Sequence, residues 1–161
     1  MGDAKPQTLE VSFGSPSPAA GQGVSAFSLG VIEGFYGRPW TPDQRHRLFA
    51  QMRGWDMNTY LYAPKEDLKH RHHWRDPYAQ LEADGLAALI RDAHDHDVNF
   101  VYALAPGLDI VHSSEADRTA LLAKLSSLAK LGARHFALLF DDIPPQMHPE
   151  DARRYAGLGE A

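Results

Sequence analysis

Stretches of strand length alternate with amphipathic helical stretches along this chain, and this alternation limits the fold more than any other feature. The last such stretch, residues 135–140, is continuously apolar after His135, as expected for a strand buried on both faces. Residues 28–33, 58–62 and 99–105 predict three earlier strands. Because strands that alternate with helices favour parallel β/α units, the predicted fold class is α/β.

Helices are predicted between these strands from apolar residues at helical spacing. Thr41 followed by Pro42 is typical of an N-cap and a first helical position. Ser114, with Asp117 three residues later, resembles a capping box. A fourth helix is expected to begin within residues 149–155. The three predicted apolar faces are Leu48, Met52 and Trp55; Leu86, Leu89, Ile90 and Ala93; and Leu121, Leu125, Leu128 and Ala129.

Two regions of different composition divide the chain. Residues 1–27 are rich in Gly, Pro, Ser and Ala, and we expect them to form a flexible tail. Residues 28–161 are expected to form part of one domain. A doubly wound sheet is one interpretation, but no Gly-x-Gly-x-x-Gly follows the first strand. A (β/α)8 barrel fits better, and since such barrels take about 250 residues, this region would supply roughly the first four β/α units, half a barrel.

Composition excludes several classes of function. A net charge of −5 without a basic segment disfavours a nucleic-acid partner. The absence of cysteine excludes disulfides and thiolate metal sites. No apolar segment is long enough to span a membrane, and the first residues lack the features of a signal peptide, so a cytoplasmic or nuclear location is expected.

Two adjacent carboxylates, Asp141 and Asp142, follow the last predicted strand and are the main candidates for catalysis. Active sites of strand–helix barrels lie at the carboxyl ends of the strands. Neighbours on one strand end cannot easily straddle a sugar ring, so they suit a glycosidase whose substrate supplies its own nucleophile, such as a 2-acetamido carbonyl. Two alternatives remain open: the pair binds a divalent cation, or it serves only as a cap or as an ion-pair partner.

Four stretches carry a resemblance to glycoside hydrolase family 84, the O-GlcNAcases, and they occur in the family's order. They are GVIEGFYGRPW (residues 30–40), NTYLYAPK (58–65), PGLD (106–109) and FALLFDD (136–142). The resemblance implies a (β/α)8 barrel that removes N-acetylglucosamine from Ser and Thr of proteins with retention of configuration. It implies no metal and no cofactor. The implied partners are O-GlcNAc-modified proteins or other GlcNAc-containing glycans.

The resemblance also implies roles for individual residues. Asp141 would orient the acetamido group, and Asp142 would be the general acid and base. Gly34 would contact the sugar through its backbone, and Lys65 would donate hydrogen bonds to sugar hydroxyls. Tyr36 would line the pocket around the acetamido methyl group.

The chain also departs from the family, whose further sugar-binding groups come from later strands. We therefore expect the isolated polypeptide to have little or no turnover. The alternative function is a truncated, inactive fragment that acts only as a binding or assembly partner, with self-association through open sheet edges.

For the other polar residues, a structural or solvated role is preferred over catalysis or metal binding. The loop segment from His70 to His73 is expected to be a solvated polar loop rather than a metal site. His94 and His96 do not share a helix face, so they are expected to have no joint role. Glu33 is either a third acid of the pocket or, as we prefer, the partner of an Arg or Lys.

Overall fold

Four parallel strands form one sheet in the computed structural model, which describes residues 27–141 and 143–160. The strands lie in the order β1-β2-β3-β4, so each pairs with its neighbour in the chain and the described strands show no reversal of order. Their bounds are β1 (Gly30–Glu33), β2 (Thr59–Tyr62), β3 (Asn99–Leu104) and β4 (His135–Leu138). The predicted α/β class with a parallel sheet is confirmed, and each predicted strand exists, although all four are shorter at one end than expected.

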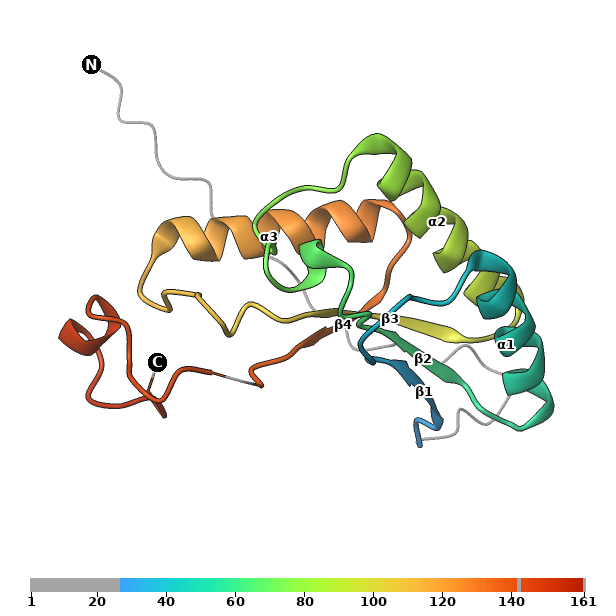
Figure 1. Cartoon of the computed structure of the whole chain (residues 1–161), viewed down its shortest axis with the longest axis horizontal. Coiled ribbons are helices and arrows are strands. Elements are labelled where there is room, and N and C mark those ends of the chain that lie inside the picture. Colours follow the sequence, from blue (N-terminus) through green and yellow to red (C-terminus); the bar gives the residue numbers. More distant parts are fainter. Residues whose placement is uncertain (1–26, 142, 161) are drawn as a thin grey trace, which may run out of the picture.

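Three helices cover one face of this sheet, as Figure 1 shows. They are α1 (Pro42–Gly54), α2 (Gln80–Asp95) and α3 (Glu115–Lys130). Short 3₁₀ turns, η1 and η2, occur at Leu68–His70 and Asp151–Arg153. The predicted fourth helix is therefore wrong, since only the η2 turn forms there. No helix of the described residues has the length and apolarity needed to cross a membrane. The predicted tail lies outside the described residues except for Phe27.

The predicted helix starts are correct, but their caps differ. Thr41 and Gln44 form a complete capping box. The Thr41 side chain accepts from the Gln44 N–H, and the Gln44 side chain accepts from the Thr41 N–H. Ser114 accepts from the Asp117 N–H, at 3.3 Å. The Asp117 carboxylate does not return this bond and instead binds Arg75, so the second capping box is only half formed.

The apolar faces of the helices meet a layer of aromatic side chains from the strands. All four predicted core residues of α2 are buried, which confirms that stripe. In α1 the prediction is correct for Met52, which is buried, and wrong for Trp55, which is 56% exposed, because the buried face runs through Phe49 and Met52. In α3 only Leu128 of the predicted stripe is fully buried. The strand residues in this core are Tyr60, Tyr62, Phe100, Tyr102 and Leu104.

The opposite face of the sheet is open within the described part of the chain. Ile32 is 67% exposed on this face, and its register partners Leu61 and Val101 are only half-buried. The expectation that residues 135–140 are buried on both faces is wrong here, since β4 is an edge strand of the described sheet and Leu138 is exposed. Helices cover one face only, and no other described element covers the second.

Two buried carboxylates join the loops that follow β2, β3 and β4. Asp117 is held by both ends of the Arg75 guanidinium, at 2.7 and 2.6 Å, and also accepts from the Val111 N–H. Asp151, 1% exposed, accepts from the backbone N–H groups of His112 and Ser113. These contacts fasten irregular segments that have no strand or helix hydrogen bonds of their own.

Gly30 provides a strict test of the sheet, because a Cβ there would lie 1.6 Å from the backbone oxygen of Thr59. We expect Gly30→Ala to lower the free energy of unfolding by at least about 2 kcal/mol, since the neighbouring strand cannot move without breaking the pairing. The matched control is Gly85→Ala in α2, where a Cβ meets nothing within 4 Å. That substitution should raise the free energy of unfolding by about 0.5–1 kcal/mol. Urea unfolding measures both, and equal effects would contradict the packing described at β1.

Low pH should remove the contribution that the Asp117 and Asp151 carboxylates make to the stability of the fold. Hydrogen bonds from Arg75 lower the pKa of Asp117 below its ordinary value of 3.8, against the opposing effect of burial. Burial alone would raise the pKa of Asp151, but hydrogen bonds from Ser113 and His112 outweigh it and the pKa is lowered. Groups with a lowered folded-state pKa stabilise the fold above the unfolded value, and this stability is lost as the pH falls from about 4.

We therefore expect Asp151→Asn to cost about 1–3 kcal/mol near neutral pH and progressively less below pH of about 4. Urea midpoints measured across this range test the expectation. Asp95→Asn, at an exposed position of α2, is the control and should follow the wild-type curve. A difference between wild type and Asp151→Asn that does not change with pH would contradict this account.

Candidate active site

The predicted site residues that the structure describes all follow the carboxyl ends of strands. Gly34 comes directly after β1, and Tyr36, Lys65 and Asp141 lie three residues beyond β1, β2 and β4 respectively. Since parallel strands present their carboxyl ends at one edge, these residues share that edge of the sheet. Asp142 lies outside the described residues.

Lys65 and Asp141 are brought together although their strands are not neighbours in the sheet. The Lys65 Nζ lies 3.7 Å from the Asp141 Oδ2, which is an ion pair but too long for a hydrogen bond. The Lys65 side chain is largely buried along its length, whereas the Asp141 side chain is 50% exposed. The pair thus offers a cationic donor and an anionic acceptor side by side to a polar ligand.

Gly107, in the loop after β3, lets that loop pack against the backbone that carries Asp141. A Cβ at Gly107 would lie 3.4 Å from both the Asp141 backbone oxygen and the Phe140 Cα, and 3.0 Å from a methyl carbon of Ile143. One β3–β4 hydrogen bond continues past the strand, from the Leu139 N–H to the Leu104 oxygen. The position of Asp141 is therefore set by close backbone packing beside β3.

The segments after β1 and β2 also contact one another. The Lys65 N–H donates to the Phe35 oxygen, and the Gly37 N–H donates to the Glu66 carboxylate. Tyr36, 72% exposed, accepts a hydrogen bond at its hydroxyl from Arg71, at 3.3 Å. The Tyr36 side chain is thus exposed and is held at its hydroxyl from the loop after β2.

The polar loop after β2 differs from the prediction. His72 and His73 are exposed, as expected for a solvated loop, but His70 is fully buried and Arg71 nearly so. The His70 Nδ1 lies 3.0 Å from the Ala103 carbonyl oxygen, so this loop is packed against β3. Burial lowers the pKa of His70 and favours its neutral form.

Glu33 is a structural residue, which confirms the preferred interpretation of it as the partner of an arginine. It is fully buried and accepts two hydrogen bonds from Arg45, both at 2.8 Å. It also accepts from the Trp40 N–H and from the Tyr60 hydroxyl. With its acceptor positions filled from the helix side of the sheet, Glu33 is not available as a third acid.

Sequence patterns did not indicate the residues that hold the site's loops in place. Asp109 of the PGLD motif accepts from the Trp74 indole N–H, at 2.8 Å, and from Arg75, at 2.7 Å. Asp67 accepts from the hydroxyls of Tyr62 and Tyr78. The available signal was an acid near each strand end facing an aromatic or basic residue of another loop, but the sequence does not show which residues pair.

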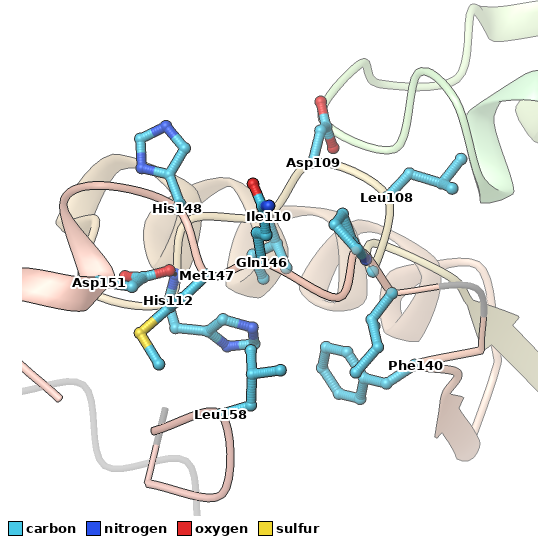
Figure 2. A pocket seen from close by; sticks show the side chains of 13 residues that line it. Leu108, Asp109, Ile110, His112, Phe140, Gln146, Met147, His148, Asp151 and Leu158 are labelled. Atoms are coloured by element: carbon cyan, nitrogen blue, oxygen red, sulfur yellow. Dashed lines mark hydrogen bonds between the residues drawn. The ribbon is translucent and has the colours of Figure 1, made fainter. Parts of the chain in front are cut away.

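An apolar cavity of about 390 Å³ lies next to this edge and is shown in Figure 2. It is formed by the loop after β3 and by the segment after β4, which contribute Ile110, His112, Phe140, Met147 and Leu158 among others. Neither Lys65 nor Asp141 lines it. A second cavity of about 510 Å³ opens between α1, α2 and the loop after β2, and it too is not lined by the pair. The Lys65–Asp141 pair therefore lies outside both of these cavities.

Asp141 belongs to no cluster of three metal-ligating side chains among the described residues; the group that the described residues do bring together is His46, Asp92 and His96, on the helices. At the strand edge, the described polar groups suit the binding of hydroxyl and amide groups.

Known proteins resemble this chain in sequence and in structure. Rat Protein O-GlcNAcase is 43% identical over 162 residues, covering 98% of this chain and 18% of the relative. Mouse Protein O-GlcNAcase is 46% identical over 143 residues, covering 89% and 16%. A solved structure of an O-GlcNAc hydrolase mutant from Thermobaculum terrenum superposes with a TM-score of 0.78 at 38% identity, covering 81% of this chain and 28% of that one.

The chain thus spans less than a fifth of the length of these curated relatives. A family model described as beta-N-acetylglucosaminidase matches residues 29–161, which include all four of the motifs and every described strand. The chain therefore belongs to the beta-N-acetylglucosaminidase family of glycoside hydrolases, to which the resemblance in its sequence had pointed.

Proposed function

We propose that this chain supplies the first four β/α units of a catalytic (β/α)8 barrel that removes O-linked N-acetylglucosamine from Ser and Thr of proteins. Family membership supports a hydrolase of N-acetylglucosaminides. Two features of the fold support the barrel: the strands follow one another without reversal, and the helices cover only one face of the sheet. The open face, with Ile32 exposed, would then face the barrel interior.

The observation that carries this proposal is the Lys65–Asp141 pair at the carboxyl edge. A partly exposed ion pair at 3.7 Å stabilises a fold by about 1 kcal/mol at most, so stability alone does not account for it. In the proposed role, the Asp141 carboxylate accepts the N–H of the 2-acetamido group and thereby orients the acetamido carbonyl toward the anomeric carbon. Lys65 donates to a sugar hydroxyl beside it.

The mechanism that fits is substrate assistance. The acetamido oxygen attacks the anomeric carbon while Asp142, as general acid, protonates the departing Ser or Thr oxygen. Water then opens the cyclic intermediate with Asp142 as general base, which gives overall retention. Adjacent carboxylates suit this division of labour because neither has to reach the opposite face of the sugar.

Gly34 and Tyr36 complete the proposed site. The Gly34 backbone lies directly after β1, where a sugar hydroxyl can approach it without a side chain in the way. Tyr36 is exposed and held by Arg71 through its hydroxyl, which leaves its ring free to line the pocket around the acetamido methyl group.

A segment exchange tests this function in a complete catalytic domain. Residues 29–161 replace the aligned segment of rat Protein O-GlcNAcase, and hydrolysis of a chromogenic N-acetylglucosaminide is compared with hydrolysis of the matching glucoside, which lacks the acetamido group. We expect the glucoside and the Asp141→Asn variant each to lose at least about three orders of magnitude in kcat/KM, because either change removes the oriented nucleophile. Asp95→Asn in the same chimera is the control.

Comparable cleavage of the two sugars would overturn substrate assistance. Initial rates are measured with and without EDTA at a temperature where the chimera stays folded. Activity that disappears with EDTA would favour the alternative in which Asp141 and Asp142 bind a divalent cation.

The leaving group tests the role of Asp142. We expect Asp142→Asn to slow hydrolysis of an alkyl or seryl glycoside by about 10²–10⁴-fold, because that oxygen must be protonated as it departs. A nitrophenyl glycoside, whose leaving group departs without a proton, should lose much less in its first step. Steady-state kcat/KM for the two substrates gives the comparison. Equal losses on both would contradict the acid role.

A further inference from the structure

Two histidines and an aspartate meet where α1 packs against α2, away from the strand edge proposed as the active site. His46 comes from α1, and Asp92 lies one turn before the end of α2, with His96 at its C-cap. One ligating atom from each of the three lies within 4.8 Å of the other two. From this cluster we propose a binding site for a divalent cation of the zinc class, which joins the two helices.

Asp92 contacts both histidines of the cluster. The Asp92 Oδ1 lies 2.8 Å from the His46 Nδ1 and 3.4 Å from the His96 Nδ1, so one carboxylate oxygen faces two imidazoles. The two rings meet edge to face with centroids 4.9 Å apart. Donor atoms around a tetrahedral zinc ion lie about 3.3 Å apart, so small side-chain rotations would close the cluster on an ion.

The His96 ring is oriented by a backbone carbonyl of its own helix. Its Nδ1 also lies 2.8 Å from the Asp92 backbone oxygen, an acceptor, so the proton belongs on Nδ1. The lone pair is then on Nε2, so Nε2, and not the Nδ1 that faces Asp92, would be the His96 ligand. A histidine that binds a metal typically has its other nitrogen held by a carbonyl or carboxylate in this way. The side chain is largely buried and packs near Phe49, which limits its rotation.

The ligand set selects the class of ion. Two imidazoles and one carboxylate suit Zn²⁺, Co²⁺ or Ni²⁺, whereas Mg²⁺ and Ca²⁺ prefer oxygen ligands throughout. Three protein ligands leave one position for water. His46, whose side chain is 60% exposed, lies on the solvent side, so an ion can enter without unfolding the helices. In this position the ion would act as a clip between α1 and α2, with no part in glycoside hydrolysis.

Zinc titration of the 161-residue chain, purified without a histidine tag, tests the proposal. We expect one equivalent of Zn²⁺ to bind in calorimetry and the thermal midpoint to rise with zinc concentration, because the ion binds only the folded helix pair. Co²⁺ should give the visible absorption bands of a four-coordinate ion. His46→Ala and Asp92→Asn should each weaken zinc binding at least about tenfold.

Matched variants separate this cluster from the other histidines. His94→Ala and Asp95→Asn alter exposed residues on the same helix, and His72→Ala with His73→Ala alters the exposed loop; none should change zinc affinity. Circular dichroism confirms that each variant is folded, and His46→Ala is the safest test because that side chain is mostly exposed. A folded wild-type chain that binds no zinc, or zinc binding that survives His46→Ala and Asp92→Asn, would overturn the proposal.

Discussion

Carboxylates that are withdrawn from water organise the whole carboxyl edge of this sheet. The loops there have few backbone partners, and unpaired backbone N–H groups are costly to bury. Glu33, Asp67, Asp117 and Asp151 each accept from at least one backbone N–H of such a loop. Three of them are also held by an arginine or by tyrosine hydroxyls. Each acid therefore replaces several hydrogen bonds that a regular element would have made.

These anchors explain why two charged groups on separate loops can meet. Lys65 lies in the loop after β2, which is tied to the segment after β1, and Asp141 lies in the segment after β4, against which Gly107 packs closely. Neither residue is positioned by the weak ion pair between them. The pair is a consequence of two rigid strand ends, which is the condition for a preorganised polar site.

The sequence predicted what depends on local spacing and missed what depends on distant pairing. The α2 stripe was predicted correctly because its buried residues lie within two turns of one helix. The partners of Arg75, Asp109 and Asp117, lie 34 and 42 residues away in the sequence, and no periodic pattern predicts these pairs. His96 was dismissed because it does not share a face with His94, whereas its neighbours in space are Asp92, one turn earlier, and His46 on another helix. The burial of His70 was missed for the same reason.

The structure also separates the motif residues into two groups by what their side chains already contact. Glu33 and Asp109 carry several hydrogen bonds each, and Gly30 and Gly107 meet neighbouring backbone, so packing alone explains them. Asp141 is different: its side chain faces Lys65 at a distance too long for a hydrogen bond, and half of that side chain is open to solvent. A carboxylate at a rigid strand end with spare acceptor positions adds little to stability. It is, however, ready to accept a hydrogen bond from a ligand, and an amide N–H of an amino sugar is the donor that the proposed chemistry requires.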